Sequence, residues 1–407
     1  MKTSKSVILA SLLAMALSSM ATAATIVHFT GSTAFRAETT QAIIKVLGGA
    51  SATFAFNQNA TNTATIKNAS QAIIYNSGQT IIAETSWSGS VAGLQALTAG
   101  TAITTFLSNT TYNPVTGTVK ATAGTLSGNV YTGGTSIPSG TAVFEAGIAP
   151  DVALADNFAG EVVGLNTSHL SPDNQVGVVV FTWVRNVGAP TDIANVTSAL
   201  AQTIFSLGAV PESNFNGNSA STTNVFVVGR DNLSGSRYVT FAETGFGINN
   251  FPSQNEVTAN AAGTAVASIN PVSGATGYSS GGLVAAALNL PGSDAAGVGG
   301  AGPGWLIAYL STSDAQSVNS GNNNITYNGV PATSAGTIIT ANITQGVYSL
   351  WGYEHFNTLT TLAGVAATTA TSVATQLTNT DAADFGAGVL IGSMAVSRTG
   401  DGQPIVP

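Results

Sequence analysis

The apolar and polar residues of this chain alternate between short apolar runs and amphipathic stretches. Near the start, the apolar run 26–29 leads into a Gly-Ser-Thr turn, and a helical pattern follows over 34–47 until two glycines end it. The same order of strand, small-residue turn and helix recurs over 81–97 and over 225–243. Three such units predict an α/β fold whose helices begin at Gly/Ser-rich turns.

The first 23 residues have the pattern of a secretory signal. Lys2 and Lys5 precede an apolar run over 7–17, and Ala21-Thr22-Ala23 supplies the small residues of a cleavage site. The apolar run is too short to cross a bilayer, and no later stretch offers about 20 uninterrupted apolar residues. We therefore expect residues 1–23 to be removed and the mature protein to be periplasmic or secreted, without a membrane anchor.

The length of the chain and its continuous apolar runs predict two lobes. Cleavage of 23 residues from 407 leaves 384, which is too many for one ordinary core. The runs 176–184 and 305–310 resemble buried strands, and we interpret them as the two crossings between lobes. Segment 98–142 is rich in Thr, Gly and Ser with period-two fragments, which predicts an inserted set of β-hairpins. Residues 24–175 and 305–407 are expected to form lobe 1, and residues 176–304 lobe 2.

Charge and cysteine content narrow the classes of function. Charged residues make up 7% of the chain, and loss of the leader changes the formal net charge from −8 to −10, which argues against binding to nucleic acid or anionic lipid. The chain has no cysteine, which excludes disulfides, thiolate metal sites and a lipid-modified N-terminus. His28 and His169 lack partners at ligand spacing. We expect a freely diffusing monomer without cofactor or metal, although the abundance of Ala, Gly, Thr, Ser and Asn also suits a secreted surface protein.

The three strand-turn-helix units share one chemistry. Each turn places small residues and hydroxyls where a helix begins, so that unpaired backbone N–H groups point at whatever lies in front. Arg36, Arg230 and Arg237 lie in or beside these turns, although the mature chain has only eight Lys and Arg residues. An arginine in the first turn of a helix opposes the helix dipole by roughly a few tenths of a kcal/mol unless an anion compensates. The pattern predicts an oxyanion site, and the alternative is pairing with an acid such as Glu38 or Glu243.

One of these turns carries a family resemblance. The loop Arg230-Asp231-Asn232-Leu233-Ser234-Gly235-Ser236 resembles the Arg-x-Asp-Gly-Ser-Gly-Thr loop of the periplasmic phosphate-binding proteins that serve ABC importers. In the same order as in that family, 31–35 resembles the N-terminal Gly-Ser-Thr turn, 89–94 the second Gly-Ser loop, and 151–156 the strand that ends in a ligand-facing Asp. The resemblance covers residues 26–314 apart from the insertion. It implies a type II periplasmic-binding-protein fold with a ligand cleft between two α/β lobes.

The resemblance also implies a function and a ligand set. The function is capture of phosphate or a related tetrahedral oxyanion, for delivery to an ABC permease and without covalent chemistry. Asp156 would accept a proton from hydrogen phosphate, and Arg230 would donate two parallel hydrogen bonds. Asn232 stands where the family has a carboxylate, and because an amide can donate to fully ionised sulfate, the choice between phosphate and sulfate stays open. The implied ligand residues are Thr33, Ala34, Phe35, Ser90, Asp156, Arg230, Asn232, Ser234, Gly235 and Ser236.

A serine-hydrolase motif provides a competing enzymatic interpretation. Gly277-Tyr278-Ser279-Ser280-Gly281 fits Gly-x-Ser-x-Gly, and Asp294 or Asp314 and then His355 follow in the hydrolase order. The motif requires a strand directly before Ser279, whereas residues 270–276 have the composition of a turn. In a chain so rich in Ser and Gly the match is expected by chance. A binding protein that is not an enzyme is therefore the favoured prediction.

Overall fold

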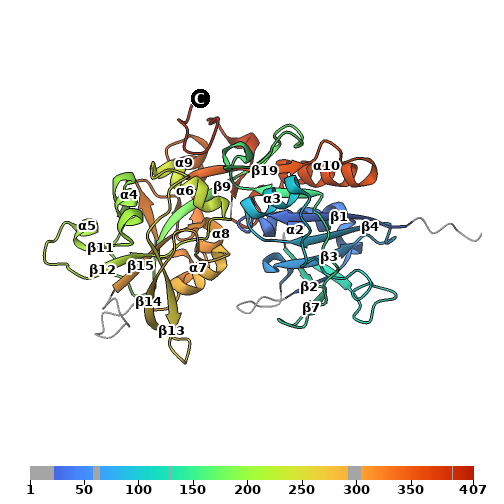
Figure 1. The fold of residues 1–407 in the computed structure, drawn as a ribbon, viewed down its shortest axis with the longest axis horizontal. Helices are drawn as coiled ribbons and strands as arrows, with labels where there is room; N and C mark the ends of the chain where they lie inside the picture. Colours follow the sequence, from blue (N-terminus) through green and yellow to red (C-terminus); the bar gives the residue numbers. More distant parts are fainter. Residues whose placement is uncertain (1–22, 58–64, 128–129, 292–303, 387) are drawn as a thin grey trace, which may run out of the picture.

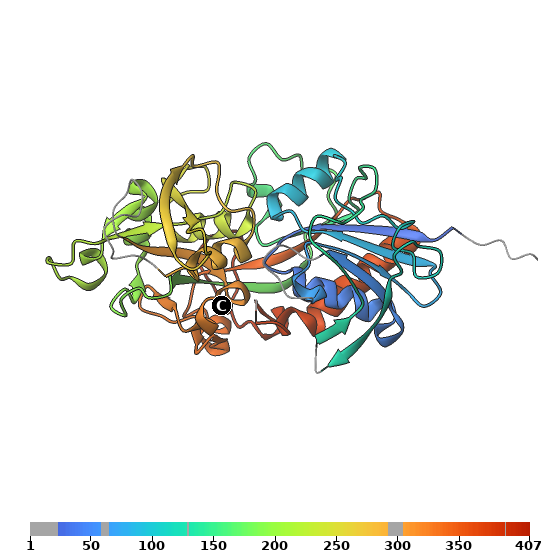
Figure 2. The same ribbon diagram turned by 90° about the horizontal axis from the view of Figure 1, so that it is seen from below.

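The computed structural model describes residues 23–57, 65–127, 130–291, 304–386 and 388–407. They form two α/β lobes that lie side by side along the long axis of the molecule (Figures 1 and 2). The predicted signal segment, apart from its last residue, lies outside these ranges. Within them, no helix combines the length and the apolar character needed to cross a membrane. The predicted two-lobe α/β architecture is confirmed.

The first lobe is built around parallel strands from the N-terminal part of the chain. Its central strand is β1, which contains the apolar run 26–29. The first two residues of β1 are partly buried and the last five are buried, as expected for such a run. Helices cover both faces of the sheet, with α3 on one side and α2 and α10 packed together on the other (Figure 2). These elements are β1 (Thr25–Gly31), β2 (Thr53–Asn57), β3 (Gln71–Tyr75), β4 (Ile81–Ser86), β8 (Val152–Ala155), β19 (Trp351–Thr358), α2 (Arg36–Val46), α3 (Ser90–Ala99) and α10 (Gly364–Asn379).

The second lobe is formed by the middle of the chain. Its strands are β9 (Gln175–Arg185), β10 (Asn195–Val196), β11 (Ala209–Pro211), β12 (Asn224–Val227), β15 (Gly304–Ser311) and β16 (Asn324–Tyr327), with the separate hairpin β13 (Gln254–Ala259) and β14 (Val266–Val272). Its helices are α4 (Ser198–Leu207), α5 (Ser213–Asn216), α6 (Gly235–Thr244), α7 (Gly281–Leu288) and α8 (Thr312–Ala315). Before and after β19 lie β17 (Thr333–Ser334), β18 (Thr337–Ile338), α9 (Thr340–Thr344) and β20 (Gly388–Val389).

One strand, β9, belongs to both lobes. From β11 to β2 the main path of the large sheet runs β11-β12-β15-β9-β19-β8-β1-β4-β3-β2, so that β9 lies between β15 of the second lobe and β19 of the first. The first half of β9 pairs with β19 and its second half with β15. The run 305–310, which the sequence suggested as the second crossing, lies inside the second lobe instead, because β15 pairs with β12 on one edge and with β9 on the other. The chain returns to the first lobe only beyond β16, later than the expected boundary at residue 304.

The predicted β-rich segment 98–142 forms the outer edge of the first lobe. It contains β5 (Thr122–Ser127), β6 (Val130–Gly133) and β7 (Thr135–Ile137). Strands β5 and β6 form an antiparallel hairpin, and both β5 and β7 pair with β2. Because β2 lies far from β8 and β9 in the strand order, the segment extends the opposite edge of the sheet, at the bottom of the first lobe in Figure 1.

An aromatic cluster fixes α6 against the sheet of the second lobe. The rings of Trp183 on β9 and Tyr309 on β15 lie 6.0 Å apart, and Phe205 of α4 and Phe241 of α6 pack 4.7 Å from each other. Phe241 also contacts Tyr309 edge-on, at 6.2 Å. All four side chains are buried, and such ring pairs stabilise a core beyond their buried area. This packing sets the position at which α6 begins.

His28 on β1 is a buried histidine between two carboxylates. Its Nδ1 lies 3.1 Å from an oxygen of Asp151, and its Nε2 lies 3.4 Å from an oxygen of Glu84. Burial by itself would lower the pKa of His28, but the hydrogen bonds to Asp151 and Glu84 outweigh this effect and raise the pKa to about 9. Within the ranges that the structure describes, no group of three or more His, Cys, Asp or Glu side chains is placed to hold a metal ion.

Protonated His28 is expected to stabilise the fold up to mildly alkaline pH. Its folded-state pKa of about 9 exceeds its ordinary value of 6.5, so the stabilisation is fully present below pH 6.5 and is lost as pH rises through about 9. The contribution is about 3 kcal/mol. Urea unfolding of the wild type and of His28→Gln at about pH 6 and about pH 9.5 measures it. The wild type should lose more stability than the variant, and an equal loss in both proteins contradicts the ion-pair assignment.

Candidate functional site

Turns that are far apart in the sequence meet where the central strands of the first lobe end. The backbone N–H of Gly89, just before α3, donates to the carbonyl of Gly31 at the end of β1, at 2.9 Å. In the first turn of α3, the N–H of Val91 donates to the carbonyl of Leu233, at 3.1 Å. Leu233 belongs to the loop that leads into α6, so this hydrogen bond joins the two lobes. The end of β1 and the starts of α3 and α6 are thereby brought to one place, and α2 follows shortly after β1 in the chain.

Asp156, directly after β8, lies at the centre of these turns. Its side chain is almost fully buried and accepts hydrogen bonds from the hydroxyl of Ser90, the first residue of α3, and from the hydroxyl of Ser236 in α6, the latter at 2.9 Å. Gly235 lies so close that an added Cβ would be 1.7 Å from Asp156 Oδ1. A negatively charged group thus sits between two helix N-termini, which is where backbone dipoles favour it. We call Ser90, Asp156, Ser234, Gly235 and Ser236 the cradle.

The loop before α6 forms the second-lobe side of the cradle. Ser234 is the N-cap of α6, and its side chain accepts a hydrogen bond from the backbone N–H of Arg237. This cap holds the first turn of α6 in place, and Ser236 then points at the carboxylate of Asp156. The start of α6 could be recognised from neighbouring residues in the sequence, because Ser at the N-cap followed by small residues is a common way to begin a helix.

Burial raises the pKa of two carboxyl groups at the cradle, Asp156 and Glu354. Burial raises the pKa of Asp156, while hydrogen bonds from Ser90 and Ser236 and the charge of Arg230 oppose that rise. Glu354 on β19 is also fully buried, and burial raises its pKa well above the usual range, with the charges of Asp156 and Glu38 adding to the effect. Burial and the neighbouring negative charges therefore favour the protonated form of Glu354.

Arg230 is buried beside the cradle and is held by backbone carbonyls. Its Nε donates to the carbonyl of Tyr278 at 3.0 Å, and its Nη2 donates to the carbonyl of Ser279 at 2.9 Å. Its charge still acts on Asp156, although no ion pair joins them among the contacts of the described residues. Arg237 contacts the protein instead, because its Nη1 donates to the carbonyl of Arg230 and its guanidinium lies over the ring of Phe241.

The structure brings together most of the ligand residues that the sequence suggested. The other four cradle residues and Arg230 gather around Asp156. Thr33 and Ala34 line a cavity between the lobes, and Phe35 is completely buried at the N-cap of α2. Asn232 does not join the cradle: it is exposed, and its backbone N–H donates to the carbonyl of Ala275. The alternative pairing of Arg237 with Glu243 is wrong, because Glu243 pairs with Arg398 at 3.1 Å.

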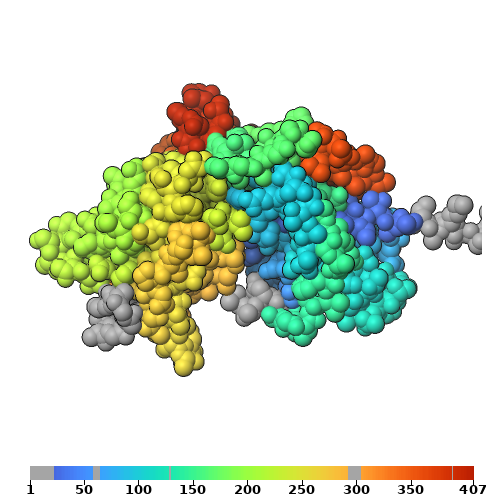
Figure 3. All heavy atoms as spheres, in the orientation of Figure 1, coloured from blue at the N-terminus to red at the C-terminus, as the bar shows by residue number. Residues whose placement is uncertain are grey.

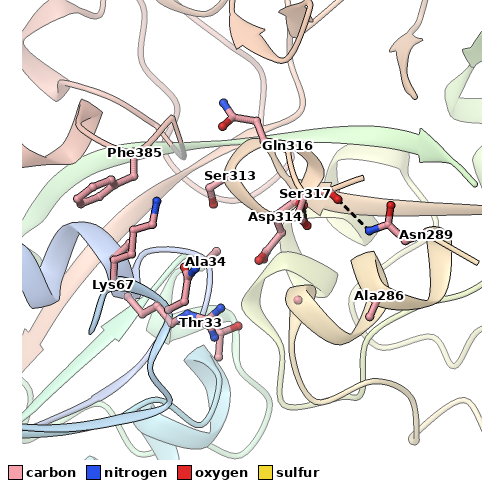
Figure 4. Close-up of a pocket in the computed structure, with 14 residues that line it drawn as sticks. Thr33, Ala34, Lys67, Ala286, Asn289, Ser313, Asp314, Gln316, Ser317 and Phe385 are labelled. Carbon is pink, nitrogen blue, oxygen red and sulfur yellow. Dashed lines mark hydrogen bonds between the residues drawn. The ribbon is translucent and has the colours of Figure 1, made fainter. Parts of the chain in front are cut away.

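Two cavities lie between the lobes, where the molecular surface is hollowed (Figure 3). The larger has a volume of about 450 Å³ and the smaller about 340 Å³. Both are lined by Thr33 and Arg36 from the first lobe and by Gly282 from the start of α7. In the larger cavity, Lys67 and Thr33 lie across from Asp314 (Figure 4). Sequence reasoning missed Lys67 and Gly282, because nothing in their local sequence indicates that they face the opposite lobe.

Ser279 lies in the smaller cavity without the surroundings of a hydrolase nucleophile. Strand β14 ends at Val272, and a turn separates it from Ser279, whereas a nucleophile elbow needs a strand immediately before the serine. Ser280 is the N-cap of α7. The downstream His355 lies on β19 of the first lobe, where its Nδ1 is 2.5 Å from an oxygen of Asp173. The Gly-x-Ser-x-Gly match therefore reflects the capping of α7.

Comparison with known proteins finds likeness in structure only. No family model matches the chain, and no curated protein matches it. A structure described as a phosphate ABC transporter substrate-binding protein with bound phosphate, from Clostridium perfringens, is 12% identical and covers 90% of this chain and 99% of its own, with a TM-score of 0.48. An ABC-type phosphate transport receptor from Vibrio cholerae is 13% identical and covers 86% and 93%, with a TM-score of 0.43. A phosphate binding protein from Stenotrophomonas maltophilia is 13% identical and covers 87% and 83%, with a TM-score of 0.39.

Proposed function

We propose that the protein binds phosphate or a related tetrahedral oxyanion in the cradle, between its two lobes. The observation that carries this proposal is the buried carboxylate of Asp156, which accepts hydrogen bonds from the hydroxyls of Ser90 and Ser236. These hydroxyls belong to different lobes and stand at the starts of two helices. Helix N-termini stabilise negative charge through their unpaired N–H groups and their dipoles. A ligand oxyanion would take over these donors, with the charge of Arg230 close by.

The properties of Asp156 favour hydrogen phosphate over sulfate. Hydrogen phosphate can donate a proton to a carboxylate, whereas sulfate is fully ionised near neutral pH and would meet Asp156 as a second unprotonated anion. Asn232 is exposed, so its amide does not compensate for this repulsion. The selectivity that the sequence left open therefore depends on Asp156. Arsenate, which has the same shape and protonation as phosphate, should compete with it.

Location and partners are part of the same proposal. The pattern of residues 1–23 and the absence of cysteine in the sequence support an exported protein that diffuses freely. Two lobes around a cleft support hinge closure over the ligand as the mechanical step, with delivery to an ABC permease. The second candidate is a secreted surface protein that keeps the two-lobe fold without binding. The exposed β5–β6 hairpin and the scarcity of charge favour that candidate.

A thermal unfolding series tests the proposal. Phosphate at about 100 times its Kd should stabilise the wild-type protein by about 2.7 kcal/mol, whereas sulfate at the same concentration should have little effect. Arg230→Ala should abolish the phosphate-induced shift, since it removes the buried cation beside the cradle. The matched control is Lys120→Ala, because Lys120 is exposed in the insertion and donates only to the carbonyl of Val115.

The outcomes separate the two candidate functions. An anion-induced shift in the wild type and in Lys120→Ala, but not in Arg230→Ala, supports oxyanion binding in the cradle. A shift of the same size in Arg230→Ala contradicts the site. The absence of any shift in the wild type with phosphate, arsenate or sulfate favours the surface protein.

A further inference from the structure

Arg36, the first residue of α2, is a largely buried cation on the wall of both inter-lobe cavities. Its side chain is only 9% exposed, and none of the residues that the structure describes accepts a hydrogen bond from it. Asp314 in the other lobe and Glu38 in α2 both attract it, and no ion pair joins Arg36 to Asp314 among the described residues. A guanidinium carries five N–H donors. Because Arg36 lines two cavities, its N–H groups are open to an acceptor that enters from them.

The surroundings of Arg36 point to an anionic acceptor. Arg36 lines both inter-lobe cavities together with Thr33, and it stands at the start of α2, whose N-cap Phe35 provides no side-chain cap. Ala34, Arg36 and Ala37 at this helix start all line the larger cavity. Lys67 adds a second cation to the wall of the larger cavity, where Asp314 is the one acid among the described lining residues. Two cations and a helix N-terminus suit a dianion better than a monoanion.

The space around Arg36 is larger than an inorganic oxyanion requires. Cavities of about 300–1,000 Å³ are typical of sites for organic ligands, and the larger cavity here has a volume of about 450 Å³. Away from Arg36 its wall is polar and mostly uncharged (Figure 4). Hydroxyl and amide groups such as these can both donate to and accept from the hydroxyls of a ligand, and a carboxylate can accept from them. They belong to Asn289, Ser313, Asp314, Gln316 and Ser317.

We propose that Arg36 and the start of α2 hold the phosphoryl group of a small phosphate ester, whose hydroxylated body fills the larger cavity against Asp314 and Asn289. This site lies beside the cradle and goes beyond the proposed function, because none of the five cradle residues lines either cavity. The guanidinium fork donates two parallel hydrogen bonds to the phosphoryl oxygens. The carboxylate of Asp314 accepts hydrogen bonds from ligand hydroxyls on the opposite wall.

Calorimetric titration of the full mature chain tests this site with four compounds: glucose 6-phosphate, glucose, gluconate and inorganic phosphate. Glucose 6-phosphate should bind more tightly than either glucose, which lacks the anion, or gluconate, which carries one charge. Arg36→Met should weaken glucose 6-phosphate binding by at least about 30-fold, the loss expected when one partner of a buried charged contact is removed. Lys120→Met removes an exposed charge in the β-rich insertion. It should change neither the affinity for glucose 6-phosphate nor the affinity for inorganic phosphate.

A second variant, Gly282→Leu, tests whether the ligand needs the volume of the cavities, whereas Arg36→Met tests the positive charge. An added Cβ at Gly282 would meet the Arg36 side chain at 3.7 Å, an ordinary contact, so the backbone accepts a side chain there. A leucine would extend into both cavities, because Gly282 lines both. Gly282→Leu should therefore retain the melting temperature and the affinity for inorganic phosphate, and lose glucose 6-phosphate binding. Since leucine favours helices more than glycine does, loss of folding is not expected from this change.

The results distinguish this inference from the proposed function. Loss of ester binding in both Arg36→Met and Gly282→Leu, with phosphate binding retained in Gly282→Leu, supports the ester site. Ester binding that survives both substitutions overturns it. A wild type that binds phosphate but not glucose 6-phosphate overturns the ester site and leaves the cradle proposal standing. A wild type that binds neither compound overturns both.

Discussion

Gly235→Ala is expected to abolish phosphate binding in the cradle. An added Cβ would lie 1.7 Å from Asp156 Oδ1 and 2.6 Å from Ser90 Oγ, which is far inside van der Waals contact. The carboxylate would have to leave the space between α3 and α6, and the two helix N-termini could no longer meet on one anion. We expect phosphate affinity to fall by about 100-fold or more, and the free energy of unfolding to fall by about 1–3 kcal/mol.

Calorimetric titration with phosphate measures this effect against a matched glycine. Gly160 also lies in the first lobe, close in sequence to Asp156, and an added Cβ there would have nothing within 4 Å. Gly160→Ala should therefore bind phosphate as the wild type does. If Gly235→Ala also binds phosphate with unchanged affinity, the ligand does not lie between α3 and α6, and the cradle is a structural contact between lobes.

Gly31→Ala is expected to have the largest effect on stability. Gly31 ends β1 with a φ of +112°, a conformation that residues with a side chain rarely adopt. An added Cβ would lie 2.0 Å from the carbonyl oxygen of Leu154 in β8, and this atom belongs to the backbone of a buried strand and cannot move aside. The free energy of unfolding should fall by about 4 kcal/mol or more, since strain and steric overlap act together.

Gly100→Ala separates the backbone strain of a positive φ from the steric overlap of an added Cβ. Gly100 has a φ of +61° at the end of α3, but an added Cβ would meet nothing within 4 Å. Its substitution should lower the free energy of unfolding by only about 1 kcal/mol, the cost of the left-handed conformation by itself. Urea unfolding of both variants measures the difference. If both variants lose the same free energy of unfolding, the backbone of β8 moves away from the added Cβ at no cost. That result would contradict the steric overlap expected at Gly31.

Local sequence was sufficient for the elements that form the site. Helix α3 begins at Ser90 and α6 at Gly235, at the small-residue turns that the sequence indicated. Such starts are predictable because a capping hydroxyl and the residues of the first turn lie within a few positions of each other. The strand before each turn was predictable for a similar reason, since a short continuous apolar run fits a strand buried on both faces.

Contacts across the lobes were not predictable in the same way. Ser236 lies 80 positions beyond Asp156, and only the order of the strands in the sheet brings them within 2.9 Å. Arg230 was expected to offer its fork to an anion, yet carbonyls of the turn before α7 accept from two of its nitrogens. The run 305–310 has the apolar character of a crossing strand, but its pairing with β12 keeps it in the second lobe. The apolar character of a run indicates that the strand is buried, whereas the strands with which it pairs depend on the order of strands in the sheet.

The sequence by itself determined the α/β class, the turns at which α2, α3 and α6 begin, and the gathering of arginines near those turns. Each of these features follows from interactions between residues a few positions apart. The tertiary structure alone decided that Asp156 fills the space between two helix starts, that Asn232 faces solvent, and that Arg36 lines two cavities between the lobes. These features depend on the packing of distant segments, because a side chain acquires its partners only when the sheet has set the spacing of the lobes.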